Sequence, residues 1–383
     1  MNHEKIGIKQ LFLLMLAFEI GTAIIFSIGT EAKQDSWLAV LVGMLYGLIL
    51  ISVFTILSEY YPGNSLIQII QITFGRFIGY PLCIAYIIYF ISQAARISRD
   101  FAELILSTIL VETPGLIIMA SFVAVIIYTL RGGVEVFGRM AEMVFPVVLL
   151  LWIITWIIIY ASGVVDLKQL TPVLGTGIKA VWKTSFPNLT SLPFGELIVF
   201  TMVWPMLNDS KKAKTVGRAA VLTGGVLLTI NMLGVLSVLG PYLIDRINVP
   251  LLVTVRMVSM ADFLERIDAV VILIMVAGGF FKVGVYIYGA AIGTAHLFQL
   301  QSYHSILIPL GVIIISLGQV MVRNVTEHNS IGSIFDMSFV HLPLQLVIPG
   351  LLLIIAFLNS RENLTGTNLK RLRPKEKAEK PIR

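Results

Sequence analysis

Long apolar runs are the feature of this sequence that most restricts its fold. A helix that crosses the hydrocarbon core of a membrane needs about 20 mainly apolar residues, and such runs recur along the 383 residues of the chain. Hydrophobic residues make up 57% of the chain and charged residues 13%, whereas an average soluble domain is roughly 25% charged. A soluble fold of this length could not cover so much apolar surface. The sequence therefore predicts an all-α membrane protein and excludes a soluble enzyme.

The apolar runs predict about ten transmembrane helices. In chain order, the spans are expected at about 10–29, 37–58, 78–111, 114–130, 140–161, 190–207, 216–240, 268–298, 304–322 and 340–358. Segments 64–75 and 249–264 contain too few apolar residues to cross, so we expect short interfacial or re-entrant helices there. We predict a single membrane domain over residues 1–360, followed by a basic tail over 361–383.

The distribution of basic residues predicts the orientation of the chain. An even number of spans places both termini on one side. If that side is the cytoplasm, 17 of the 28 Lys and Arg residues lie inside and 8 lie outside, with Arg96, Arg99 and Lys282 within spans. The positive-inside rule therefore predicts cytoplasmic N- and C-termini. The tail is expected to be disordered and to lie near anionic lipid. Because the basic residues cluster in loops and in the tail, we expect no nucleic-acid partner.

Two of the predicted spans contain helix-breaking residues at matching positions. Span 1 carries Glu19-Ile20-Gly21-Thr22-Ala23, and span 6 carries Pro193-Phe194-Gly195-Glu196. Five spans separate the two breaks, so the second half (about 190–358) would be inverted relative to the first (about 10–161). Gly and Pro often serve only close packing of membrane helices. Matching breaks beside carboxylates instead favour a ligand site, where free backbone groups attract the carboxylate and ammonium groups of an amino acid.

Ionisable residues within the spans are a second indication of a site. A charge at the membrane centre costs roughly 3 kcal/mol or more, so it usually faces protein or water and has a role. Glu19 and Glu196 lie at the two breaks, and Lys282 lies in span 8. A buried Lys282 needs a counter-charge, which either Glu19 or Glu196 could supply. Our hypothesis is that the Lys282 ammonium replaces a sodium ion held by related transporters.

A polar stripe in span 3 has two open interpretations. Gln93, Arg96, Asp100 and Glu103 follow helical spacing on one face. Arg96 with Asp100 and Arg99 with Glu103 are also at ion-pair spacing. The stripe is either a structural network or exposed vestibule, or a charge-coupling element that includes Arg96 and Asp100.

Motifs of soluble enzymes are absent from the sequence. It contains no Walker A loop, HExxH, GxSxG or CxxC motif, and its five His residues have no metal-ligand spacing. We therefore predict no catalytic residue, metal or cofactor.

Seven motifs occur along the ten predicted spans. In chain order they are Glu19-Ile20-Gly21-Thr22, Asp35-Ser36-Trp37, Phe74-Gly75-Arg76-Phe77-Ile78-Gly79, Glu112-Thr113-Pro114, Leu170-Thr171-Pro172-Val173-Leu174-Gly175, Pro193-Phe194-Gly195-Glu196 and Phe280-Phe281-Lys282. In this order the motifs resemble one family. Over about residues 5–358 the chain resembles the B subunits of spore germinant receptors, which are spore permease-like proteins of the amino acid–polyamine–cation transporter superfamily.

The resemblance implies a five-plus-five inverted repeat, LeuT-like, with broken spans 1 and 6. It also implies that the chain senses a nutrient germinant, with an amino acid expected, in the spore inner membrane beside an A subunit and a lipoprotein C subunit. The ligand contacts it implies are Gly21, Thr22, Gln93, Gly195, Glu196, Lys282 and Val283. Many superfamily members have a second glycine where this chain has Thr22-Ala23, which could narrow the choice of ligand.

Three functions remain open at this point. The chain could be a germinant-binding receptor subunit, an amino acid transporter coupled to protons through Glu19 or Glu196, or a membrane scaffold with a vestigial site.

Overall fold

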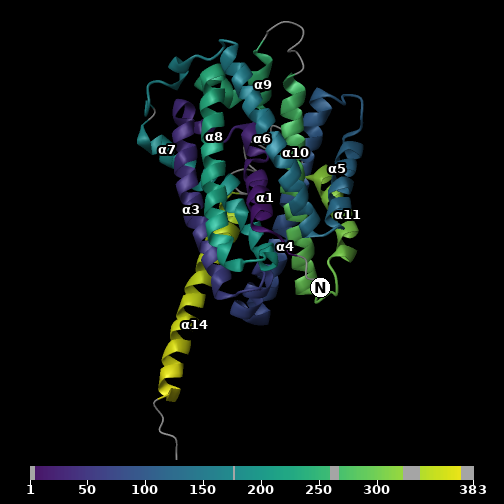
Figure 1. The fold of residues 1–383 in the computed structure, drawn as a ribbon, viewed down its shortest axis with the longest axis vertical. Coiled ribbons are helices and arrows are strands. Elements are labelled where there is room, and N and C mark those ends of the chain that lie inside the picture. Colours follow the sequence, from purple (N-terminus) through teal and green to yellow (C-terminus); the bar gives the residue numbers. More distant parts are fainter. Residues whose placement is uncertain (1–4, 176, 259–266, 322–336, 372–383) are drawn as a thin grey trace, which may run out of the picture.

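A computed structural model of the chain describes residues 5–175, 177–258, 267–321 and 337–371. In this part of the chain the fold is a bundle of helices that run along its long axis (Figure 1). Seven helical segments in the described residues are long and apolar enough to cross a membrane, and Gly115–Leu130 and His304–Val320 are shorter apolar helices. Together with an irregular span 6, they correspond to the ten predicted spans and confirm the all-α membrane fold.

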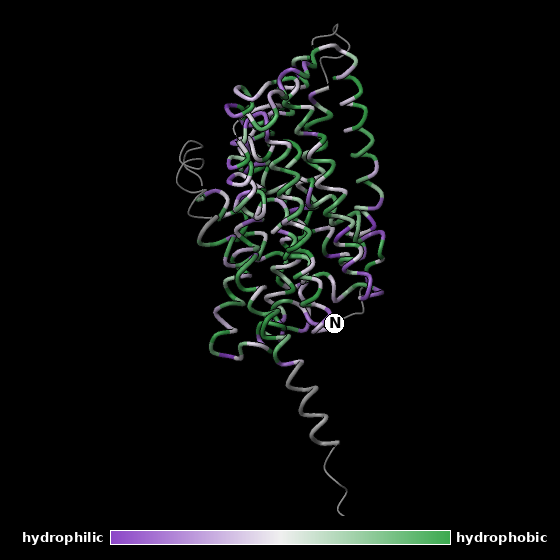
Figure 2. The backbone as a smooth tube through the Cα atoms, turned by 90° about the vertical axis from the view of Figure 1, so that its left-hand side faces the viewer, coloured by the Kyte–Doolittle hydropathy of each residue, from purple (hydrophilic) through white to green (hydrophobic). Residues whose placement is uncertain are grey.

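The surface of the bundle is apolar, as a lipid-facing surface must be. Large hydrophobic side chains such as Tyr128 and Met143 are 81% and 75% exposed. Hydrophobic residues dominate most of the length of the bundle (Figure 2). In helices, every backbone group inside the membrane can be paired within its own segment.

Span 1 is broken where the sequence predicts it. Helix α1 (Ile8–Ile20) ends at Gly21, and α2 (Ala23–Phe26) follows as a single turn. Gly21 has φ 5° and ψ −99°, outside the helical region. A Cβ at Gly21 would lie 3.0 Å from the Phe18 carbonyl oxygen and 3.3 Å from that of Gly278, so a side chain is poorly tolerated there.

Span 6 is irregular over a longer stretch than its sequence suggests. After α7 (Ile178–Thr184), the π-helical segment η3 (Ser185–Phe194) is interrupted by extended residues at Phe186 and Leu192. The 3₁₀ segments η4 (Gly195–Met202) and η5 (Trp204–Met206) complete the span. The break at Pro193-Phe194-Gly195-Glu196 is therefore present, and it divides π-helical from 3₁₀ backbone. Such departures from α-helix are frequent at hinges and functional sites.

The ends of the two broken spans meet, as expected for inverted halves. The Ile6 N–H, just before α1, donates to the Met206 carbonyl oxygen at 2.9 Å, and the Asn208 N–H donates to the Ile6 carbonyl oxygen at 3.1 Å. The beginning of span 1 is thus tied to the end of span 6. Because these are opposite ends of the two spans, the spans run in opposite directions.

The remaining spans enclose α1, which lies in the middle of the bundle (Figure 1). Helix α1 packs against α8 (Ala213–Leu243), α6 (Val134–Ala161) and α10 (Ile267–Leu297). Outside them, α3 (Ser36–Tyr60) packs on α8, and α4 (Leu66–Thr108) packs on α10 and on α11 (His304–Val320). Helix α5 (Gly115–Leu130) packs on α4 and α11.

Several predicted boundaries shift in the structure. The expected interfacial segment 64–75 is the first part of α4, set off from span 3 by a kink at Gly75, where φ is 66°. Span 3 ends at Thr108, and span 5 begins already at Val134. Of the segment 249–264, α9 covers Pro250–Arg256. Residues 259–264, and residue 322 at the end of span 9, lie outside the described residues.

The last span differs most from its prediction. It begins with π-helical turns, η9 (Met337–His341) and η10 (Pro343–Val347), and continues as α14 (Ile348–Arg371). The prediction that the chain becomes disordered from Arg361 was wrong for residues 361–371, which prolong α14 as a helix away from the bundle (Figure 1). Residues 372–383 lie outside the described part of the chain.

Candidate functional site

A buried ion pair joins span 6 to span 8. Nζ of Lys282 on α10 lies 2.5 Å from Oε2 of Glu196, and the two side chains are 4% and 2% exposed. Glu196 is positioned by the 3₁₀ segment that follows the span 6 break. Of the two counter-charges considered from the sequence, the structure therefore pairs Glu196 with Lys282. A buried pair of this kind needs further hydrogen bonds to offset the loss of hydration.

Two aromatic residues support this pair. The Tyr286 hydroxyl, one turn along α10 from Lys282, donates to Glu196 Oε1 at 2.9 Å. The Lys282 ammonium lies 5.3 Å from the centre of the Phe18 ring on α1, within the range of a cation–π interaction. Span 1, span 6 and span 8 therefore all contribute to the environment of one charge pair.

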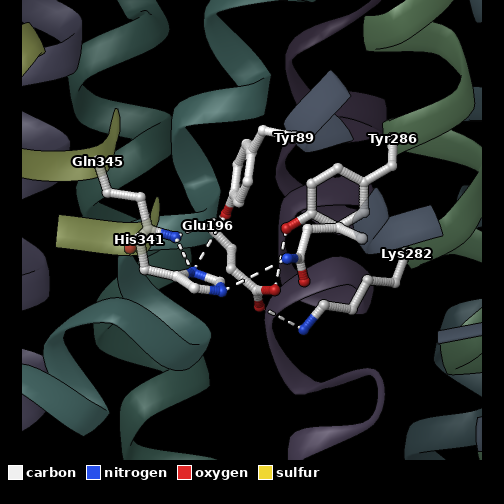
Figure 3. Close-up of polar contacts among 7 residues, drawn as sticks. Tyr89, Glu196, Lys282, Tyr286, His341 and Gln345 are labelled. Carbon is white, nitrogen blue, oxygen red and sulfur yellow. Dashed lines mark hydrogen bonds and ion pairs between the residues drawn. The ribbon is translucent and has the colours of Figure 1, made fainter. Parts of the chain in front are cut away.

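A second polar group continues from the pair toward the last span (Figure 3). Gln345 on η10 donates from Nε2 to the Tyr89 hydroxyl on α4 at 2.7 Å, and the same atom lies 3.0 Å from Nδ1 of His341. Gln93 on α4 lies 3.4 Å from the other ring nitrogen of His341. The Tyr89 and Tyr286 rings are in contact, with centroids 6.4 Å apart. The two polar groups thus form one continuous cluster.

The backbone at both breaks is closely packed in this structure. A Cβ on Gly195 would overlap the Gln345 amide oxygen. A Cβ on Gly278 of α10 would lie 2.7 Å from Cα and from the carbonyl oxygen of Gly21. Span 8 therefore covers the span 1 break, and the last span covers the span 6 break. The arrangement is closed around the cluster.

Glu19, the other carboxylate beside a break, has a different environment. It is fully buried, and neither carboxylate oxygen has a hydrogen-bond partner among the described residues. Its carboxyl group lies against Gly224 of α8, where a Cβ would come within 2.7 Å of Glu19 Cδ.

The other predicted site residues lie around this centre. Thr22 follows Gly21 at the break and is half-buried, and Val283 is buried beside Lys282 on α10. Arg96 and Asp100 lie one and two turns beyond Gln93 on α4 and are half-buried. The expected pair of Arg99 with Glu103 is formed at 2.6 Å, with side chains 24% and 34% exposed.

Sequence reasoning missed four members of the cluster: Tyr89, Tyr286, His341 and Gln345. Tyr89 is four residues before Gln93, and Tyr286 is four residues after Lys282, so helical spacing could have placed both on the faces already identified. His341 and Gln345 form a polar pair at the same spacing within a predicted span. No group of three or more His, Cys, Asp or Glu residues in the described part of the chain could hold a metal ion.

Comparison with known families and sequences gives a consistent result. Residues 5–325 match the Spore_permease family, described as "Spore germination protein". Spore germination protein KB of Bacillus subtilis (strain 168) is 34% identical over 373 residues, which are 97% of this chain and 100% of that protein. Spore germination protein YndE of the same strain is 24% identical and covers 77% of this chain and 82% of its own length.

Comparison with solved structures identifies the fold. MhsT, solved in complex with L-phenylalanine, has a TM-score of 0.64 at 16% identity, over 90% of this chain and 87% of that one. Mhp1, a nucleobase–cation symporter solved with bromovinylhydantoin bound, has a TM-score of 0.58 at 14% identity, over 84% and 73%. These likenesses confirm the predicted LeuT-like transporter fold with two broken spans.

Proposed function

We propose that this chain, which belongs to the Spore_permease family of spore germination proteins, binds a small nutrient germinant between its broken spans 1 and 6. The chain is a non-enzymatic, multi-pass membrane protein that resembles a germinant receptor subunit. The observation that carries the proposal is the buried polar cluster, in which Lys282, Glu196 and Gln93 come together from three spans. Polar groups converging in an apolar surrounding are typical of small-molecule sites.

An amino acid is the nutrient that suits the two breaks best. The Lys282 ammonium and the backbone N–H groups at the start of the 3₁₀ segment η4 offer positive partners for a carboxylate. The end of α1 offers a negative helix terminus for an ammonium group. Gly21, Thr22, Gly195 and Val283 would border the ligand, and Arg96 and Asp100 would lie in the approach along α4.

Binding would act as a switch because the site is closed. The Gln345 side chain covers Gly195 and the Gly278 backbone covers Gly21, so a ligand needs the last span or span 8 to move. A ligand shifts such a balance only by its difference in affinity for the open and closed arrangements. We propose that the receptor A subunit and the lipoprotein C subunit read this shift in the spore inner membrane, and that both termini of this chain face the cytoplasm.

Transport is the alternative, and the second buried carboxylate favours it. Glu19 and Glu196 are both fully inside the protein, and carboxylates at this depth often carry protons in transporters. A proton-coupled amino acid permease would use the same site but would release its ligand on the other side of the membrane.

The test measures binding and uptake by the full chain reconstituted in lipid. Radiolabelled amino acids, nucleosides and sugars are offered to the wild type, to Gly195→Leu and to the control Gly350→Leu, whose helical position has open space around it. We expect saturable amino acid binding without accumulation, lost at least tenfold in Gly195→Leu and kept in Gly350→Leu. Accumulation driven by a proton gradient would establish the transporter instead, and no binding of any compound would reject both.

A further inference from the structure

Glu19 is a buried carboxyl group for which the described residues supply no hydrogen-bond partner. The residue is 0% exposed, and both of its carboxylate oxygens lack a hydrogen bond. No Lys, Arg or His nitrogen of the described residues lies within ion-pair distance of it. A bare carboxylate at the centre of a membrane is costly. The protein keeps this carboxyl group beside the break at which the ligand is proposed to bind.

The surroundings of Glu19 are suited to a cation. The residue lies in the last turn of α1 (Ile8–Ile20), and the helix dipole places negative potential at this end. The Ala17 carbonyl oxygen accepts the Gly21 N–H there at 3.0 Å. Gly224 of α8 contributes no side chain on the facing side. The carboxylate and the helix end therefore both repel anions and attract a positive group.

Lys282 does not fulfil this role in the structure. Its ammonium lies 2.5 Å from Glu196 and 5.3 Å from the Phe18 ring. Glu196 also accepts a hydrogen bond from Tyr286. The Lys282–Glu196 pair is thus neutral as a unit. Lys282 acts on Glu19 only at longer range, and an ionised Glu19 would have no ion-pair partner of its own among the described residues. One further positive charge would complete the site.

We propose that Glu19 anchors the primary ammonium group of the nutrient. The inference rests on the proposed function and refines it, since it assigns the ligand to amine-bearing nutrients rather than to sugars or simple carboxylates. The ligand ammonium pairs with the Glu19 carboxylate in the last turn of α1 once the site opens, and the ligand carboxylate is left for Lys282 and the span 6 backbone. The two carboxylates therefore have different roles: Glu196 pairs with Lys282, and Glu19 pairs with the ligand ammonium.

The experiment compares ligands that differ only at the amine. L-Alanine with propanoate and L-leucine with 4-methylpentanoate are bound to the full chain in lipid nanodiscs, as wild type, Glu19→Gln and Glu19→Asp. The remote variant Glu142→Gln, which alters an exposed pair with Lys9, is the control. We expect the wild type and Glu142→Gln to bind an amino acid at least tenfold more tightly than its deaminated analogue. Glu19→Gln should lose this preference, and Glu19→Asp should keep part of it.

Thermal unfolding without ligand provides an independent readout. Because the carboxyl group of Glu19 has no hydrogen-bond partner among the described residues, Glu19→Gln should not lower the unfolding temperature, whereas a structural role for Glu19 would lower it and count against the proposal. Replacement of sodium and potassium by choline should leave amino acid binding unchanged. If binding disappears in choline, an alkali cation occupies Glu19 and the ammonium assignment is wrong.

Binding of these ligands to the wild type and to Glu19→Gln separates the possible failures. If a deaminated analogue binds as tightly as its amino acid, or if Glu19→Gln retains the preference, the Glu19 assignment fails while the midplane site stands. If the wild type binds none of the four compounds and no member of the wider nutrient panel, the proposed function fails and the Glu19 assignment falls with it.

Discussion

At the scale of single residues, the Lys282–Glu196 pair is the feature that most shapes the site. Both charges are almost fully removed from water and lie 2.5 Å apart. Their attraction offsets the cost of burial only while both are present. The pair therefore fixes span 6 against span 8 and at the same time holds an ammonium ready for an anionic group.

The pair predicts strongly unequal effects of single and double substitutions. Lys282→Met leaves Glu196 buried without its cation and should lower the free energy of unfolding by about 3–5 kcal/mol. Lys282→Met combined with Glu196→Gln should lose much less, since the new amide would carry no charge and its oxygen could still accept from Tyr286. Thermal or denaturant unfolding in detergent measures both. Equal destabilisation of the single and double variants would show that the two charges do not act as a pair.

The sequence identified the charged residues of the site but not their partners. Glu19, Glu196 and Lys282 stand out because charges are rare in apolar spans. Their pairing depends on how spans far apart in the chain are packed, and periodicity carries no information on that. Tyr89 and Gln345 were missed because Tyr and Gln are less unusual in a membrane helix than a charge. The proposed roles of the site residues remain predictions.

At the scale of elements, the span 1 break depends on the neighbouring helix. The α10 backbone at Gly278 touches Gly21 directly because neither residue has a side chain. Small residues allow membrane helices to approach in this way. The break therefore depends both on the residues of span 1 and on Gly278 of span 8, which leaves the α10 backbone uncovered by a side chain.

Two adjacent glycines allow a matched test of this contact. Gly278→Ala places a Cβ 2.7 Å from the Gly21 backbone and should destabilise the protein by about 1–3 kcal/mol, as overpacking does. Gly279→Ala meets only the Phe122 ring at 3.6 Å, an ordinary contact, and should be neutral or slightly stabilising in a helix. Unfolding temperatures of the two variants decide the matter, and equal values would argue against the close contact.

Helix existence was predictable at this scale, whereas helix geometry was not. The apolar runs predicted the spans, and Gly21 and Pro193 predicted the two breaks. The long irregular stretch from Ser185 to Met206 was not predicted. Its π and 3₁₀ turns depend on contacts with other helices, such as Gln345 against Gly195. The helical extension to Arg371 was missed because polar composition was taken as disorder.

At the scale of the whole molecule, spans 1 and 6, which are corresponding spans of the two halves, run in opposite directions. The hydrogen bonds of Ile6 with Met206 and Asn208 join the start of one to the end of the other. This arrangement agrees with the transporter fold of MhsT and Mhp1. The orientation of the molecule in the membrane is a separate prediction, which rests on the Lys and Arg counts.

Labelling of introduced cysteines tests the orientation. The chain has one cysteine, Cys83, which is buried and can be replaced by Ser. In this background, an impermeant maleimide should label Lys168→Cys in intact cells and Lys5→Cys only after lysis, since both positions are exposed. The reverse pattern would show that the N-terminus lies outside.

The central claim is that a germinant is recognised where spans 1 and 6 are broken. Its most direct test is dipicolinate release from spores whose chain carries Gly21→Trp, over a panel of amino acids, nucleosides and sugars. Gly350→Trp is the matched control, because position 350 has no neighbour within 4 Å of an added Cβ.

The account predicts that Gly21→Trp spores lose the response to one nutrient while Gly350→Trp spores keep it. Protein levels in both strains are checked by blot, so that a lost response counts only where the chain is present, and responses through other receptors should be intact. An unchanged response in Gly21→Trp spores would contradict the claim and favour a scaffold without a working site.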